Sequence, residues 1–198
     1  TLGTDQLHAG LLAGGLGLIL VILYSLFYYR ALGLVTVGSL GLASLLLYLI
    51  IVVLGENIGF TLTLAGIAGA IVAIGITADS FIIYFERLRD EIREGRSLRS
   101  AVEMGWQRAR RTIIISDIVS LIAALLLYIF AIGNVRGFAF ALGLTTVIDL
   151  IIVFLFTKPI ITVLANLKFF RDGNPMSGLN AHKVPGAINA AKNEKESN

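Results

Sequence analysis

The chain has 198 residues, of which 57% are hydrophobic and only 15% are charged, and its mean hydropathy is +0.87. Soluble domains contain about 45–50% apolar and about 25% charged residues, so this composition excludes an ordinary soluble domain. Three runs without a charged side chain, of 21, 25 and 22 residues, cover positions 9–29, 31–55 and 57–78. Because a membrane-spanning helix needs about 20 apolar residues, the sequence predicts a polytopic membrane protein.

The remaining composition excludes several kinds of catalytic and metal site. The chain has no cysteine, and its two histidines, His8 and His182, lie near opposite ends. Disulfides, thiolate chemistry, a histidine metal cluster and a Ser-His-Asp triad are therefore excluded within this chain. The sequence also lacks the GxxxxGK[ST] pattern of a phosphate-binding loop. We predict that the chain is not an enzyme and uses neither a cofactor nor a metal.

Five membrane-spanning helices are predicted, and the expected fold class is an all-α helix bundle. Their expected ranges are residues 8–29, 32–54, 61–85, 112–133 and 137–157, the last continuing toward 168. Together they form a transmembrane domain over residues 1–170. The tail at 171–198 is rich in Asn, Gly, Lys and Pro and is predicted to be disordered. Since the chain opens without an initiator Met, we expect an N-terminal portion to precede Thr1.

The basic residues predict the orientation in the membrane. Of the 16 Lys and Arg residues, 15 fall in connections that alternate onto one side, and Arg136 alone lies on the other. The positive-inside rule places the basic side in the cytoplasm, so the N-terminus of this chain lies outside and the C-terminus is cytoplasmic. This distribution accounts for the isoelectric point of 9.3 without nucleic-acid binding.

The cytoplasmic connection at 86–111 is predicted to be amphipathic and helical in two pieces. The third span is expected to continue to a stop at Gly95. Ser97 is then expected to cap a second helix, with Trp106 on its apolar face, lying at the membrane surface. The alternative is a docking site for a nucleotide or a protein.

Small residues follow the third span at helical spacing. Among them, Gly66, Gly69 and Gly75 are predicted to allow close helix packing. Such packing matters in lipid, where no hydrophobic force drives helices together.

Three aspartates lie within the predicted spans, where each costs about 2.5–3.5 kcal/mol on insertion scales. Asp79 shares a face of the third span with small residues and is expected to point into the bundle interior. Asp117 lies near the cytoplasmic end of the fourth span, and Asp149 lies near the middle of the fifth. The spans contain no Lys or Arg to neutralise them. Since burial favours the neutral form of a carboxyl group, such residues can take up and release a proton.

Asp79 is the primary predicted proton-relay residue, and Asp117 and Asp149 are secondary candidates. The alternative for each carboxyl is a packing role, with hydrogen bonds to Ser, Thr or backbone carbonyls. This alternative is favoured for Asp117, which is close to the headgroups and to Arg110 and Arg111. For Asp149 the two interpretations have equal weight.

The residues around Asp79 resemble the SecD/SecF family of the RND superfamily. The stretch from Thr1 to Gly14 resembles the point where SecD chains re-enter the membrane, and AGIAG at 65–69 is similar to SecD rather than SecF. Together the matching stretches cover about residues 1–170. The others are AGIAGAIVAIGITAD at 65–79, FERLRDE at 85–91, RTI at 111–113 with Asp117, and GNVRGFA at 133–139.

This resemblance implies a half-unit of an RND-type bundle, which has six helices in the full protein. It implies a subunit of the Sec accessory complex that uses the proton-motive force to promote preprotein export across the bacterial cytoplasmic membrane. The implied partners are SecF in a heterodimer, the SecYEG channel with SecA, and the translocating preprotein. Asp79 matches the family's proton-relay aspartate, whose basic partner is expected from SecF.

The chain departs from the common family pattern at two positions. Phe81 stands where Asn is commoner, and Asp149 is outside the general pattern. The sequence Asp79-Ser80-Phe81 resembles actinobacterial members. One alternative function is a half-unit of an RND-type proton-coupled exporter of small molecules or lipids. Another is a scaffold that moves no protons, whereas an intramembrane hydrolase is disfavoured because the aspartates lack the paired spacing.

Overall fold

The computed structural model describes residues 2–58 and 63–167, and these residues form long helices joined by short connections. The predicted disordered tail at 171–198 lies outside the described residues. The elements are α1 (Leu2–Tyr29), α2 (Ala31–Ile58), α3 (Leu64–Arg93), α4 (Leu98–Phe130), α5 (Asn134–Ile152), the π-helical turn η1 (Val153–Thr157) and α6 (Lys158–Leu164).

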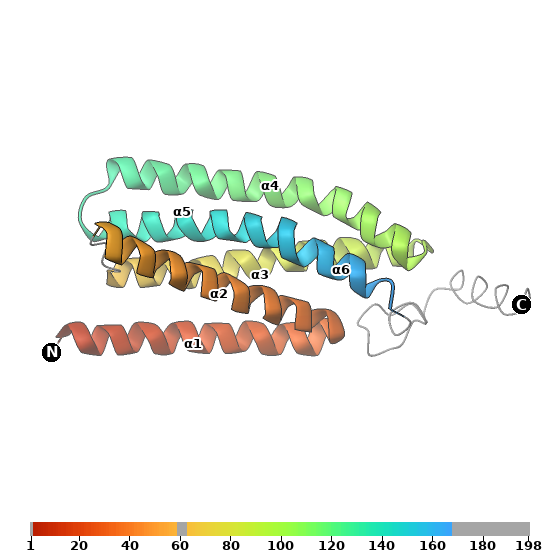
Figure 1. Cartoon of the computed structure of the whole chain (residues 1–198), viewed down its shortest axis with the longest axis horizontal. Coiled ribbons are helices and arrows are strands. Elements are labelled where there is room, and N and C mark those ends of the chain that lie inside the picture. The colour runs from red at the N-terminus through yellow and green to blue at the C-terminus, as the bar shows by residue number, and fades with distance from the viewer. Residues whose placement is uncertain (1, 59–62, 168–198) are drawn as a thin grey trace, which may run out of the picture.

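The helices run alternately up and down in one bundle (Figure 1). The α1–α2 and α3–α4 connections lie at one end, and the α4–α5 connection lies at the other end with the N-terminus. Within the described residues, five segments are long and apolar enough to cross a membrane, and the last of them is made of α5, η1 and α6 together. The predicted all-α polytopic bundle is therefore confirmed.

The connection between the third and fourth spans differs from the prediction. α3 does continue to Arg93, Gly95 has a positive φ of 86°, and Ser97 caps the next helix by accepting a hydrogen bond from the Ser100 amide. However, that helix is α4 itself, which runs unbroken from Leu98 to Phe130. The prediction of a separate helix on the membrane surface was therefore wrong. No Pro or helix-ending Gly interrupts α4, and its buried face continues past the expected boundary into the membrane span.

The last span continues beyond residue 157, as predicted, and ends at Leu164. Its helix widens to a π-helical turn at Val153–Thr157 before Pro159, which has no backbone N–H to donate. This turn is tied to α2, because the hydroxyls of Ser39 and Thr157 are hydrogen-bonded at 2.9 Å.

The buried apolar side chains form two clusters along the bundle axis. The larger one lies toward the α3–α4 connection and contains large side chains, including Phe81, Tyr84 and Trp106. The smaller one lies toward the opposite end and consists of Ala73, Ala124 and Leu142. Bulky groups therefore fill one half of the bundle, whereas small residues bring the helices together in the other half.

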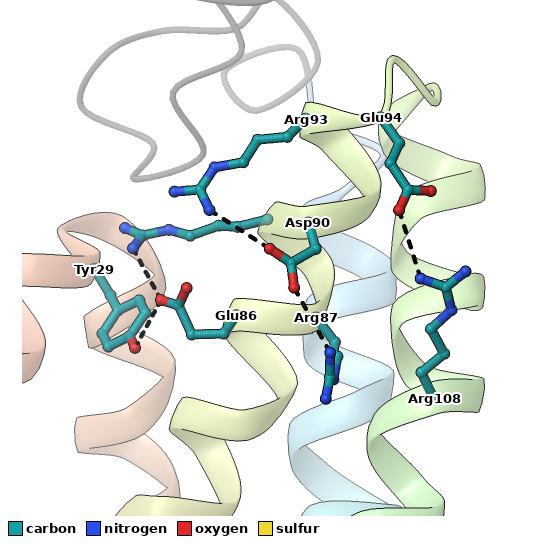
Figure 2. Close-up of polar contacts among 8 residues, drawn as sticks. Tyr29, Glu86, Arg87, Asp90, Arg93, Glu94 and Arg108 are labelled. Atoms are coloured by element: carbon teal, nitrogen blue, oxygen red, sulfur yellow. Dashed lines mark hydrogen bonds and ion pairs between the residues drawn. The ribbon is translucent and has the colours of Figure 1, made fainter.

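A polar cluster fastens α1 to α3 at the basic end. The buried Arg89 donates to the backbone carbonyl of Tyr28 at 2.8 Å and to Glu86 at 3.2 Å. Its guanidinium also lies over the rings of Tyr28 and Tyr29, at 4.8 and 4.6 Å from their centroids. The Tyr29 hydroxyl donates to the same Glu86 carboxylate at 3.1 Å (Figure 2). The planar guanidinium thus satisfies two acceptors and two aromatic faces at once.

A second set of ion pairs closes the α3–α4 connection. The side chain of Glu91 is fully buried between Arg96 and Arg108, each at 2.7 Å. Glu94 also faces Arg108, at 3.7 Å (Figure 2). The predicted amphipathic segment is therefore a packed corner of the bundle.

We expect Arg89→Lys to lower the free energy of unfolding by about 1–3 kcal/mol, because an ammonium group cannot reproduce the forked hydrogen bonds and ring contacts. Arg87→Lys is the matched control. Arg87 is half-exposed and pairs weakly with Asp90, at 3.8 Å, so its change is expected to stay within about 0.5 kcal/mol. Thermal unfolding of the full-length protein in detergent measures both. Equal unfolding temperatures for the two variants would contradict a stabilising role for Arg89.

Candidate functional site: the intramembrane aspartates

Asp149 is buried in the centre of the bundle. It lies on α5, is 1% exposed, and faces α3. The hydroxyl of Ser80 donates to its Oδ2 at 2.9 Å, and Thr77, one turn earlier on α3, also interacts with the carboxyl group. Its Oδ1 has no hydrogen-bond partner among the described residues.

Asp117 is buried as well, on the facing side of α4. It is fully inaccessible, and neither of its carboxyl oxygens has a hydrogen-bond partner in the described part of the chain. The carboxyl groups of Asp117 and Asp149 lie close enough to interact electrostatically. The structure therefore brings these two predicted residues together, although they are 32 positions apart in the sequence.

Asp79 lies on a different face of α3. Its side chain is exposed, as are Ala68, Val72 and Gly75 on the same stripe of the helix. The expectation that Asp79 points into the interior is therefore wrong for the helices described. The opposite face of α3, with Ala73, Thr77 and Ser80, is the one that packs into this bundle.

The three glycines predicted to pack against other helices also lie on different faces of α3, since Gly66 and Gly69 are buried and Gly75 is exposed. Gly66 and Gly69 are buried, and a Cβ at Gly69 would lie 2.7 Å from the backbone oxygen of Phe138 on α5. A Cβ at Gly75 would meet no atom of this chain within 4 Å. The described helices do not explain a packing role for Gly75, so this role stays a prediction.

An apolar cavity of about 410 Å³ lies between α1, α2, α3 and α5. Its lining includes Gly10 and Gly14 of α1, Ile74 of α3 and Ile148 of α5. Thr77, which interacts with Asp149, also contributes to the wall. The cavity therefore reaches the polar residues beside the buried carboxyl pair.

Sequence reasoning did not single out the hydroxyl groups on α3 as partners of Asp149. Thr77 and Ser80 are three positions apart, which places them on one face of a helix. That spacing was a usable signal, but nothing in the sequence says which helix this face meets.

These residues could not hold a multi-ligand metal centre. Among the described residues, no group of three or more His, Cys, Asp or Glu side chains is placed to bind an ion. The functional groups that these residues offer are carboxyl groups, at Asp79 on the exposed face of α3 and at the buried Asp117 and Asp149.

Comparison with known proteins identifies the family of this chain. A family model described as the MMPL family matches residues 3–174. The chain belongs to the MMPL family. This match covers every described membrane span.

Three relatives of this MMPL chain are each named protein translocase subunit SecD. The protein translocase subunit SecD of Streptomyces coelicolor is 61% identical over 178 residues, which cover 90% of this chain and 31% of the relative. SecD of Mycobacterium tuberculosis is 57% identical over 161 residues, 81% of this chain and 28% of the relative. SecD of Desulfurispirillum indicum is 39% identical over 160 residues, 81% of this chain and 30% of the relative. The predicted resemblance to the SecD/SecF family is confirmed. The two actinobacterial relatives have higher sequence identities, 61% and 57%, than the 39% of the Desulfurispirillum relative.

The MMPL chain also resembles a solved structure. The crystal structure of SecDF, a translocon-associated membrane protein from Thermus thermophilus, matches with a TM-score of 0.77 and 35% identity. The match covers 84% of this chain and 23% of that chain. The present chain thus spans about a third or less of the length of these relatives, and the exporter alternative gains no support from them.

Proposed function

We propose that this chain is the membrane portion of a SecD-type subunit of the protein translocase, a transport protein without catalytic chemistry of its own. It lies in the bacterial cytoplasmic membrane with its N-terminus outside and its C-terminus in the cytoplasm. The support is the 61% identity to a SecD over most of the chain and the common fold with SecDF. The proposed partners are SecF, the SecYEG channel with SecA, and the preprotein in transit.

The observation that carries the mechanism is the exposure of Asp79 on the apolar stripe of α3 formed by Ala68, Val72 and Gly75. A carboxylate that faces lipid costs about 2.5–3.5 kcal/mol, so such a stripe is stable only when another helix covers it. We propose that the partner half covers this stripe and supplies the basic group that faces Asp79. Asp79 would then take up a proton from outside and release it to the cytoplasm.

Proton movement can supply useful work at this position. One charge that crosses a potential of about 100 mV yields about 2.3 kcal/mol. This energy is comparable to the cost of burying the ionised aspartate, so protonation of Asp79 can change how α3 packs against the partner half. Movement of α3 would be transmitted to the rest of the chain through its tight contact with α5 at Gly69.

Asp79→Asn in the full-length protein is expected to abolish the gradient-dependent part of preprotein export. Asparagine keeps the shape of the side chain but cannot titrate. The measurement is export into inverted membrane vesicles with ATP, with and without a proton gradient, after assembly with SecF is verified.

Asp90→Asn is the matched control, because Asp90 is a partly exposed carboxylate on the same helix that pairs with Arg87 and Arg93. It is expected to leave the gradient-dependent increment unchanged. An unchanged increment in an assembled Asp79→Asn complex would reject the relay and favour a scaffold role for this chain.

A further inference from the structure

A polar layer crosses the bundle between the two apolar clusters, and the proposed function does not use it. The layer consists of Asp117 on α4, Asp149 on α5, and Thr77 and Ser80 on α3. Their exposed fractions are 0%, 1%, 5% and 4%. All four side chains are therefore withdrawn from both lipid and solvent by the packing of three helices of this chain.

The hydrogen bonds within the layer leave most of its carboxyl oxygens without a donor. Of the four oxygens, only Oδ2 of Asp149 accepts a hydrogen bond of normal length within the described part of the chain, from Ser80. The neighbouring Thr145 and Thr146 donate their hydroxyls to backbone carbonyls of α5, so they do not serve the carboxyls. Buried polar atoms are nearly always satisfied in folded proteins, so these orphan oxygens require an explanation.

No charged group within the described residues compensates the pair. Neither carboxyl takes part in an ion pair. On α4, Arg110 and Arg111 precede Asp117 by about two turns and are exposed. On α3, Asp79 points to the opposite face, and Arg89 is bound to Glu86 and α1.

Among the described residues, the remaining helices contribute no cation to the layer, and Lys158 of α6 is paired with Glu103 at 3.4 Å. On α5, Arg136 lies at the far end and stacks on Tyr128 at 4.4 Å. The stretches 9–29 of α1 and 31–55 of α2 contain no charged residue. Two ionised carboxylates that repel each other, without a cation and out of water, are strongly disfavoured.

We propose that Asp117 and Asp149 form an internal proton-binding site, in which the pair holds a proton at neutral pH. A protonated carboxyl is neutral and gains an O–H donor, so it suits a buried site without a cation better than a second carboxylate does. A divalent metal fits less well, because Ca²⁺ and Mg²⁺ take six or more oxygen ligands and the layer offers few free ones. This site lies inside one chain, on the opposite face of α3 from Asp79, and it does not depend on the proposed relay.

The experiment is infrared difference spectroscopy of the full-length protein, assembled with its partner half in lipid nanodiscs at pH 7 without sodium. The spectrum of the double variant Asp117→Asn/Asp149→Asn is subtracted from that of the wild type. We expect a positive C=O stretch of a protonated carboxyl group in this difference. Asp90→Asn is the control, and its difference spectrum is expected to lack that band because Asp90 is ionised and paired with arginine.

Absence of the band with a folded double variant would overturn the proposal. Loss of the wild-type band on addition of Na⁺ at constant pH would also overturn it, by identifying a sodium site. Should the double variant fail to assemble, each single variant is compared with the wild type; a change in the band is expected in both, and no change in either rejects the site. Since the spectrum is recorded without export, the result is independent of the Asp79→Asn experiment.

Discussion

Gly69→Val is expected to lower the free energy of unfolding of the full-length protein by about 3 kcal/mol, at the upper end of overpacking costs. A Cβ at Gly69 would lie 2.7 Å from the backbone oxygen of Phe138 and 3.2 Å from the Cβ of Ala141, both on α5. The oxygen belongs to a helix backbone and cannot rotate away, so α3 and α5 must separate. Their separation weakens the dispersion contacts that hold helices together in lipid. Unfolding by heat or by SDS titration measures the loss.

Gly17→Val provides the control on a helix of similar hydropathy. A Cβ at Gly17 would meet no atom of this chain within 4 Å, and valine is a better helix former than glycine. The stability of this variant is expected to stay within about 0.5 kcal/mol of the wild type or to rise slightly. If Gly69→Val were as stable as Gly17→Val, the close contact between α3 and α5 would not limit stability.

The membrane helices could be predicted because their signal is compositional. Runs of about 20 uncharged residues identify spans whatever face each helix turns inward. The boundary of α4 was harder to predict, because arginines at 108, 110 and 111 look like the end of a span. In the structure they occupy one side of α4, while Ala109 and Ile113 on the other side are completely buried. Charge near a span therefore did not mark the end of its helix.

The surroundings of Asp117 were hard to predict for the same reason. With a helix start near 112, Asp117 would lie about one turn inside the bundle. Because α4 begins at Leu98, Asp117 is 19 residues along the helix, about 28 Å from its start at 1.5 Å per residue. The arginines that seemed able to neutralise it are exposed and lie about two turns earlier on α4.

The inward face of α3 could not be deduced from the sequence. One face carries Ala68, Val72, Gly75 and Asp79, and the other carries Gly69, Ala73, Thr77 and Ser80. Both combine small residues with polar groups, so hydrophobic periodicity does not separate them. The structure packs the second face against α4 and α5 and leaves the first exposed. A helix with two such faces can pack on both sides, which is what the core of a two-half bundle requires.

Gly75→Leu tests this interpretation directly, and its expected effect is loss of assembly without loss of fold. Within this chain a side chain at Gly75 has open space, so the five helices should keep their stability. In the assembled complex, the proposed partner helix approaches the stripe around Gly75 and Asp79, and a leucine would hold it away. An overpacking cost of about 1–3 kcal/mol corresponds to a fall in association of roughly 5- to 150-fold.

The measurement is recovery of SecF with a tagged full-length subunit from detergent-solubilised membranes, at subunit concentrations near the dissociation constant. Gly17→Leu is the matched control, because Gly17 also has no neighbour within 4 Å among the described residues but lies on another helix, α1. Its recovery of SecF is expected to equal that of the wild type. Equal recovery for Gly75→Leu would mean that the stripe faces lipid in the complex.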